Sequence, residues 1–421
     1  MKVIEYFKLN IITLRYTILN GLNKIFQAFL QIFAIFVITK LFNNNEVTIL
    51  FLLFGYIVWF QLFEAGFSQT LQNKYNSKEI SSSNFYFICI IHLTVLFFLS
   101  VIFYMTSAYT FLLPNENFNK DIINSFSLGC SILIVSCNNL VIQRLLMVLN
   151  ADMLINKFQF LQSLLSVLGL SFCLLNEEKN LYIVILSYFL PFLIINLLTL
   201  IKVKKLFNLK LQFSKKIFKT NFFSHLLYFW IIGALSSIYV GLDYYFATRF
   251  LKISEINEYH IYSRVFFISF IFYYSFIQYS SKNISKNYLI KNYENIMKIS
   301  KVSIMIGFFA VFGIFLITII MNNHGIIIWL TNGISLKISI LYFALFYYIV
   351  RVFRDVILII LRCTDFVKKS IIIHLIEIFV AILLMNYFIP KYQINGLFLS
   401  YSIATVCGLL FFIKDFRKLK L

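Results

Sequence analysis

The chain has 421 residues, of which 61% are hydrophobic and 13% charged, and its mean hydropathy is +0.85. A soluble domain of this length could not bury so much apolar surface, so we expect a membrane protein. The formal net charge is +20, but the basic residues form short clusters between apolar stretches. This pattern excludes a nucleic-acid-binding protein, which would gather them on one soluble face.

The apolar stretches predict an all-α integral membrane protein with about twelve transmembrane helices, because a helix needs roughly 20 apolar residues to cross a bilayer. In chain order the expected spans cover approximately residues 18–42, 48–71, 84–113, 122–149, 156–175, 181–203, 222–247, 258–280, 299–321, 335–361, 368–389 and 394–414. We expect the first span to remain in the protein rather than to be cleaved as a signal peptide. Pro191 lies inside the sixth span, where it would kink the helix.

A basic segment near the middle of the chain divides these spans into two sets of six. Residues 202–219 contain seven lysines and no acidic residue, which is typical of a cytoplasmic segment beside anionic lipid headgroups. A simple loop between helices is the alternative. We predict an N-terminal half (1–203), a basic cytoplasmic connector (204–220) and a C-terminal half (221–421), as in many secondary transporters.

The distribution of lysine and arginine predicts the orientation. With both termini in the cytoplasm, most basic residues outside the apolar cores fall in cytoplasmic segments, including the central lysines, residues 282–301 and the tail 414–420. The expected external segments carry few basic residues. This is the positive-inside pattern, and it supports an even number of spans.

Several expected spans carry polar side chains at helical spacing. Such stripes usually face the interior of a helix bundle or a wet cavity, because a polar group facing lipid is costly. Hydrogen bonding between helices is the alternative for any one stripe. The stripes comprise Asn20, Lys24, Gln27 and Gln31; Gln61, Glu64 and Ser68; Ser136, Asn139, Gln143 and Asn150; Gln159, Gln162 and Ser166; and Ser236, Tyr239 and Asp243.

Charged residues inside the C-terminal spans are further candidates for a site. Arg264 lies four residues after His260 in span eight, and Arg351, Arg354 and Asp355 lie well inside span ten. Arg351 and Asp355 can form a structural ion pair at i, i+4, which would leave Arg354 in need of a partner. In the N-terminal half, snorkelling towards the membrane surface is the alternative for Lys24.

His374 and Glu377 stand at i, i+3 in span eleven and could relay protons or form an interior pair. Together with Glu64, Asp243 and Asp355 they are the candidates for ion coupling. Arginine forks match phosphate oxygens, and amides match sugar hydroxyls, so an anionic, sugar-bearing substrate suits these residues.

Enzymatic motifs are absent from the sequence. It has no Gly-x-x-x-x-Gly-Lys-Ser/Thr phosphate loop, no His-Glu-x-x-His and no Gly-x-Ser-x-Gly. The six cysteines contain no Cys-x-x-Cys pair, so neither a disulfide framework nor a zinc site is indicated. We therefore expect a transporter without a metal or a cofactor, driven by a gradient.

Three segments resemble the Wzx-type polysaccharide (O-antigen) flippases of the multidrug/oligosaccharidyl-lipid/polysaccharide (MOP) exporter superfamily. Residues 63–74 read FEAGFSQTLQNK, similar to the family's acidic-x-Gly segment, with Glu64 where aspartate is usual. Residues 241–251 and 258–264 are similar to an aspartate-containing span followed by a tyrosine-to-arginine turn. Residues 396–405 are similar to the Gly-to-Ala-Thr entry of the last span.

The resemblance implies a function. Such flippases move undecaprenyl-diphosphate-linked oligosaccharide repeat units across the bacterial cytoplasmic (inner) membrane by alternating access of two six-helix bundles, for O-antigen, lipopolysaccharide or capsule synthesis. It implies membrane lipids and polysaccharide polymerase or export proteins as partners, and it matches Glu64, Asp243 and Arg264. Lys24, Arg351 and Arg354 are added from intramembrane charge, and Gln27, Gln31, Asn139 and Gln143 from the polar stripes.

Two other functions stay open at this stage. A multidrug or small-solute exporter of the same architecture would need acidic residues to dominate the cavity, and Glu64 and Asp243 could do so. A membrane-bound polysaccharide polymerase or ligase would share the span number and basicity, but the expected external loops are too short for its catalytic loop. A major-facilitator transporter is disfavoured because residues 73–78 lack that family's Gly-x-x-x-Asp-Arg pattern.

Overall fold

A computed structural model describes residues 2–106, 108–114, 118–212, 222–363 and 367–416. In these ranges the chain forms helices and no strands. The chain divides into two compact units, which are treated separately below. Unit 1 comprises Met1–Val37, Phe60–Phe111 and Phe118–Gly233, and unit 2 comprises Ile38–Trp59, Leu112–Asn117 and Ala234–Leu421.

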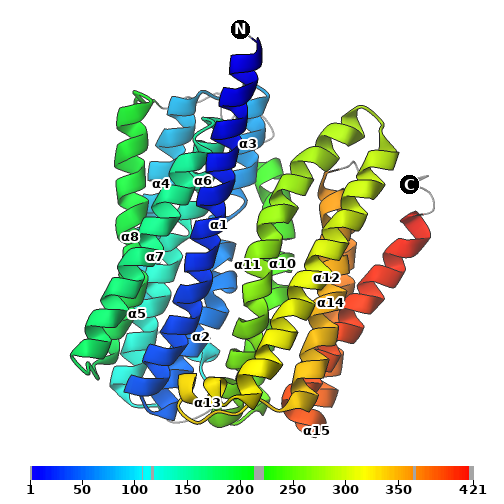
Figure 1. The fold of residues 1–421 in the computed structure, drawn as a ribbon. Coiled ribbons are helices and arrows are strands. Elements are labelled where there is room, and N and C mark those ends of the chain that lie inside the picture. Colours follow the sequence, from blue (N-terminus) through cyan, green and yellow to red (C-terminus); the bar gives the residue numbers. More distant parts are fainter. Residues whose placement is uncertain (1, 107, 115–117, 213–221, 364–366, 417–421) are drawn as a thin grey trace. The chain divides into compact units, whose positions relative to one another are not determined.

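Unit 1 is a bundle of long helices with shorter ones at its breaks (Figure 1). It contains most of α1 (Lys2–Leu41), η1 (Gln61–Glu64), α3 (Phe67–Asn76), α4 (Ser82–Met105), most of η2 (Ala108–Leu112), α5 (Lys120–Ser136), α6 (Asn138–Val148), α7 (Asp152–Leu175), α8 (Leu181–Leu206) and the start of α10 (Phe222–Phe250). Helix α8 packs against both α5 and α7, and α6 contacts α7 and α8. One apolar core includes Leu71, Phe85, Leu145 and Val203, from α3, α4, α6 and α8.

The expected span 48–71 is not one continuous helix. Helix α2 (Asn44–Phe60) ends in η1, and Ala65 and Gly66 then take left-handed conformations with φ of 53° and 75° before α3 begins. Two successive left-handed residues cannot continue a right-handed helix. A Cβ on Gly66 would lie 2.7 Å from the carbonyl oxygen of Leu226, so glycine also permits the close approach of α10.

Helices α7 and α8 approach closely beside Pro191, which lies within α8. Because proline has no N–H, it leaves the carbonyl of Ser187 without its usual helical donor. A Cβ on Gly169 of α7 would lie 2.8 Å from that carbonyl oxygen. One residue further on, the Ser166 hydroxyl donates to the carbonyl of Tyr188 at 2.9 Å. A small residue and a hydroxyl thus bring α7 against α8 at the proline.

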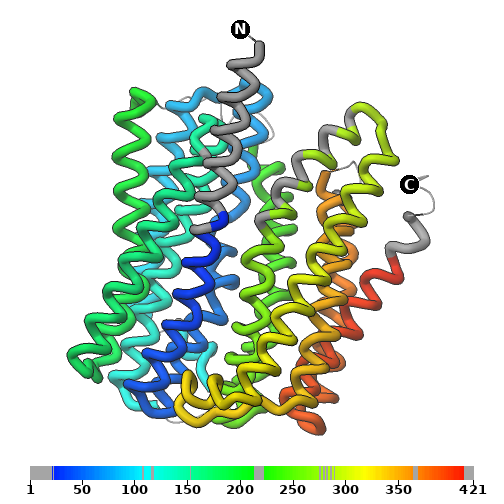
Figure 2. The backbone as a smooth tube through the Cα atoms, in the orientation of Figure 1, coloured from blue at the N-terminus to red at the C-terminus, as the bar shows by residue number. Residues whose placement is uncertain are grey.

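Unit 2 contains the end of α1, α2 and the C-terminal helices. These are the remainder of α10, α11 (Ile253–Leu289), α12 (Tyr293–Asn323), α13 (Ile326–Leu330), α14 (Ile338–Arg362) and α15 (Val367–Phe416). Helices α11 and α12 form a long antiparallel pair, and α14 packs against α11, α12 and α15 (Figure 2). Helix α15 breaks at Gln393, whose φ is 50° and ψ −127°. Its two arms correspond to the last two expected spans.

Nine helices in the described ranges are long and apolar enough to cross a membrane. Helices α11 and α14, which match the expected spans 258–280 and 335–361, are not among them, and the two arms of α15 count once. Helix α14 is not counted because three charged residues, Arg351, Arg354 and Asp355, interrupt its apolar sequence. Every expected span therefore has a helical counterpart, although the expected span 84–113 ends at Met105 in α4 and continues only as η2.

The predicted division into residues 1–203, 204–220 and 221–421 stays a prediction, because residues 213–220 of the connector lie outside the described part. Within unit 2, α2 contacts the C-terminal helices. The Thr48 hydroxyl donates to the side-chain oxygen of Asn257 at 2.9 Å, and the Asn257 amide donates to the carbonyl of Asn44 at 3.2 Å.

Candidate functional site

A buried group of charges in unit 2 is centred on Arg354. Its guanidinium binds the Glu377 carboxylate with two parallel hydrogen bonds, Nε to Oε1 at 2.7 Å and Nη2 to Oε2 at 2.8 Å. Arg354 is 3% exposed and Glu377 0% exposed. This bidentate pair joins α14 to the first arm of α15. Glu377 is thus the partner of Arg354, which the sequence alone did not identify.

Asp355 connects this pair to Arg351. Its carboxylate accepts from Arg354 Nη1 at 3.3 Å and from the Tyr274 hydroxyl at 3.1 Å, and Arg351 Nε lies 4.0 Å from it. Arg351 Nη2 in turn donates to the Tyr274 hydroxyl at 3.1 Å. The expected contact between Arg351 and Asp355 is therefore present but loose, and Asp355 contacts both arginines. With their ordinary charges, these two arginines, Asp355 and Glu377 sum to zero.

His374 completes the group. Its Nδ1 lies 3.0 Å from Arg354 Nη2 and 3.3 Å from Glu377 Oε2. Because a guanidinium only donates hydrogen bonds and a carboxylate only accepts them, the tautomer of His374 decides whether Nδ1 accepts from Arg354 or donates to Glu377. Nε2 is buried and has no hydrogen-bond partner in the described part of the chain. His374 and Glu377 are thus an interior pair, and a role in proton relay stays a prediction.

Asp243 lies in a tyrosine cluster of α10, α11 and α15 that adjoins the charged group, since the Arg354 guanidinium carbon lies 4.6 Å from the centre of the Tyr239 ring. Its carboxylate accepts from the Tyr259 hydroxyl at 2.6 Å and from the backbone N–H of Tyr244 at 2.8 Å. The Tyr401 hydroxyl accepts from the Asp243 backbone at 2.8 Å and donates to the carbonyl of Tyr239 at 2.8 Å. The aspartate is 9% exposed, and neutral hydroxyl and amide groups hold it in place.

Arg264 contacts the aromatic residues of α2 and α10 through His260. Its Nε donates to His260 Nε2 at 3.1 Å, and His260 Nδ1 bonds the Tyr244 hydroxyl at 2.7 Å. The guanidinium carbon lies 5.2 Å from the centre of the Phe54 ring, a cation–π distance. A stack between His260 and Phe51, with ring centres 4.0 Å apart, fixes the imidazole.

In unit 1, a chain of hydrogen bonds leads from Lys24 to α7. Lys24 Nζ donates to the Gln27 oxygen at 3.3 Å, the Gln27 amide donates to Asn23 at 3.4 Å, and the Asn23 amide donates to Gln159 at 3.1 Å. Asn23 is 1% exposed, whereas Lys24 is partly exposed. The stripe prediction did not include Asn23, although its i, i+4 spacing to Gln27 could have indicated it. The side chain of Asn20 lies outside the described part.

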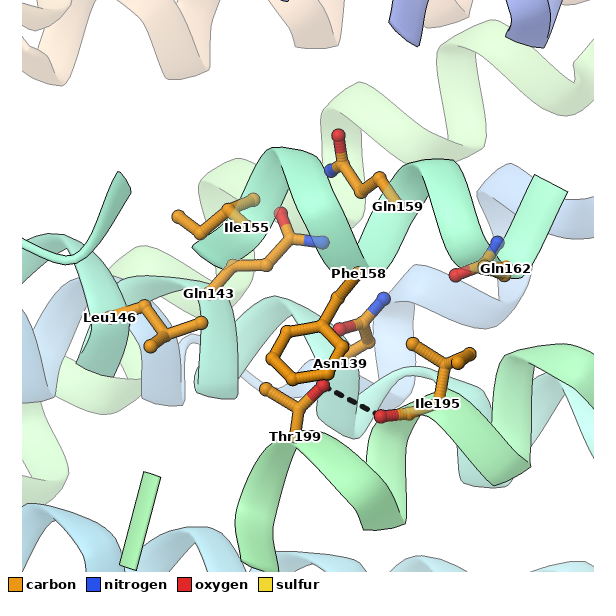
Figure 3. Close-up of a pocket in the computed structure, with 9 residues that line it drawn as sticks. All are labelled: Asn139, Gln143, Leu146, Ile155, Phe158, Gln159, Gln162, Ile195 and Thr199. Carbon is orange, nitrogen blue, oxygen red and sulfur yellow. Dashed lines mark hydrogen bonds between the residues drawn. The ribbon is translucent and has the colours of Figure 1, made fainter. Parts of the chain in front are cut away.

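Gln159, at the end of this series of hydrogen bonds, lines a polar pocket between α6, α7 and α8 (Figure 3). Its volume is about 10 Å³. Four apolar side chains contribute to its wall, and its polar lining residues are Asn139, Gln143, Gln159, Gln162 and Thr199. The predicted stripes of spans four and five thus share one pocket, whereas Gln31 does not line it.

Glu64 caps a helix. Its carboxylate accepts from the backbone N–H of Gly66 at 3.1 Å and from that of Ser68. These are donors at the start of α3 that have no partner within the helix, and a carboxylate there is favoured by the helix dipole. Glu64 therefore has a structural role, and its predicted part in ion coupling or substrate binding stays a prediction.

The candidate residues thus fall into separate groups. Lys24 and Gln27 join the amide pocket with Asn139 and Gln143 in unit 1, while Arg351, Arg354, Asp355, His374 and Glu377 form one cluster in unit 2. Tyr274, Tyr259 and Tyr401, which hold the acidic residues of unit 2, were missed because tyrosine is abundant along the whole chain.

Comparison with solved structures identifies the architecture. A multidrug resistance MATE family transporter of the MOP superfamily, in an inward-facing conformation, matches 93% of this chain and 95% of its own, with a TM-score of 0.70 and 12% identity. The lipid II flippase MurJ, in an inward closed conformation, matches 95% and 87%, with a TM-score of 0.68 and 15% identity.

A MOP superfamily transporter from Pyrococcus furiosus, described as having a binding pocket of reversed polarity, matches 97% of this chain and 96% of its own, with a TM-score of 0.68 and 12% identity. Neither a protein-family model nor a curated protein sequence matches the chain. The predicted all-α membrane fold is confirmed, and it is the fold of MOP superfamily transporters. The three proteins named here are described as two transporters and a flippase.

Proposed function

We propose that this protein is a flippase that moves undecaprenyl-diphosphate-linked oligosaccharide repeat units across the bacterial cytoplasmic membrane for surface polysaccharide synthesis. The observation that carries the proposal is in unit 1, where Lys24 is hydrogen bonded through Gln27 and Asn23 to a pocket lined with uncharged amides. A cation suits a diphosphate, and amides suit sugar hydroxyls. The shared fold with a lipid II flippase supports a lipid-linked substrate.

Arg264 is the candidate cation of unit 2. Its Nε donates to His260, and its guanidinium lies over the Phe54 ring. Glu377 and Asp355 already neutralise Arg354. We therefore rank Lys24 above Arg354 and Arg351 as a phosphate ligand. The polyprenyl tail would remain in lipid while the two helical halves alternate in access.

The test removes each charge while keeping a polar side chain. Lys24→Gln and Arg264→Gln, expressed in a host that lacks this protein, should leave the protein in the membrane but reduce surface polysaccharide at least about tenfold, the effect of losing about 1.4 kcal/mol of binding. A matched control is Lys179→Gln, at an exposed position between α7 and α8. Normal polysaccharide with both variants would remove these residues from the site.

Multidrug export is the second candidate, and the shared fold with MATE transporters favours it. It would need an available carboxylate for a cationic drug. Asp243 is held by Tyr259 and the backbone of Tyr244, and Glu64 caps α3, so both carboxylates already have partners. Resistance to cationic dyes on overexpression, with an unchanged glycan profile in the deletion strain, would favour export over flipping.

A further inference from the structure

The pocket between α6, α7 and α8 is lined by nine side chains, of which five are polar. Its polar side chains are all uncharged, comprising four amides and the Thr199 hydroxyl. The amides of Asn139, Gln143 and Gln162 have no hydrogen-bond partner in the described part of the chain. Figure 3 shows these amides on α6 and α7, with Thr199 on α8. Amides beside apolar helices are costly unless another group satisfies them.

Two polar side chains of α8 at or beside the pocket have unused hydrogen-bonding capacity. Asn196 lies on α8 between Ile195 and Thr199, which both line the pocket, and it is 1% exposed. Neither its amide nitrogen nor its oxygen has a hydrogen-bond partner in the described part. The Thr199 hydroxyl donates to the carbonyl of Ile195 at 2.6 Å, so its oxygen can still accept a hydrogen bond.

The size and chemistry of the pocket limit its occupant. A volume of about 10 Å³ has room for one water-sized group. That group must both donate to amide or hydroxyl oxygens and accept from amide nitrogens, which a hydroxyl does and an ammonium or carboxylate does not. An ion is also disfavoured because no charged side chain lines the pocket.

We infer that this pocket is a subsite for one uncharged sugar hydroxyl, and that it recognises the saccharide next to the diphosphate. The inference rests on the proposed function and adds the part of the substrate that unit 1 recognises. Gln159 lines the pocket and accepts from Asn23, so the bonds that reach Lys24 also orient the pocket wall. A phosphate near Lys24 and a hydroxyl in the pocket would thus be bound by one connected set of side chains.

The test compares two lipids on the purified full chain in lipid nanodiscs. One is undecaprenyl diphosphate without sugar, and the other is the lipid-linked repeat unit isolated from the host. The wild type should bind the sugar-bearing lipid about fivefold more tightly, the size expected for one neutral hydrogen bond. Gln143→Leu and Thr199→Val should each abolish this difference while leaving the affinity for the sugarless lipid unchanged.

Asn176→Leu is the matched control, since this amide is exposed at the end of α7 and should keep the difference. Thermal melting of each variant checks that it is folded. Equal binding of the two lipids by the wild type, or a difference that survives in both pocket variants, would overturn the inference and leave the pocket to an ordered water. Failure of the wild type to bind either lipid has a different signature, and it would overturn the proposed function together with the subsite.

Discussion

At the scale of single residues, the charges buried in unit 2 are held by one another. Arg354 and Glu377 are almost wholly buried, and each oxygen of Glu377 accepts a hydrogen bond from Arg354. A buried carboxylate is costly once its cation is removed, whereas replacing both partners with apolar residues is often tolerated. The first role of this pair is therefore to fix α14 against α15.

Arg354→Leu should destabilise the protein by about 3–5 kcal/mol, because it leaves Glu377 buried without a countercharge. The double variant Arg354→Leu/Glu377→Leu should recover most of the loss. Thermal melting of the purified variants in detergent measures both effects. A single variant as stable as the wild type would show that the pair does not hold the helices together.

Two variants of Glu64 can separate its role in capping α3 from a role in ion coupling. Glu64→Ala removes the acceptor for the N–H groups of Gly66 and Ser68. It should cost about 1 kcal/mol, the usual value of an N-terminal cap. Glu64→Gln keeps an oxygen in the same place and should cost less. If Glu64→Gln is stable and still transports, a titrating role for Glu64 in ion coupling is excluded.

At the scale of helices, the spans follow from hydrophobicity alone, but their interruptions do not. The close packing of α10 against Gly66 joins segments that are far apart along the chain, which no local pattern reveals. The partner of Arg354 likewise lies on α15, beyond the reach of i, i+4 reasoning within α14. Polar stripes predicted Asn139 and Gln143, yet only packing shows that they share a pocket with Thr199.

A pair of glycine variants tests the break between α2 and α3. Gly66→Ala should lower the melting temperature, because the residue has φ of +75° and its Cβ would lie 2.7 Å from the backbone of α10. Gly313→Ala, inside α12 with open space around the Cβ position, should be neutral or stabilising by up to about 1 kcal/mol. Equal effects of the two substitutions would contradict the packing described here.

At the scale of the whole molecule, the fold is shared with a multidrug resistance MATE family transporter and with the lipid II flippase MurJ. The fold alone therefore does not choose between them. We favour a flippase because uncharged amides are connected to Lys24 in unit 1 and because the carboxylates in unit 2 already have partners. Composition predicted the membrane and the helices, whereas the chemistry of the substrate required the side-chain contacts.

The most direct measurement is to delete the gene in its own host and determine on which leaflet the lipid-linked repeat units accumulate. We expect that surface polysaccharide is lost and that single repeat units stay on the cytoplasmic leaflet, protected in intact spheroplasts from an added glycosidase. Repeat units that reach the outer leaflet and are digested there would show that this protein is not the flippase, and so would an unchanged glycan profile.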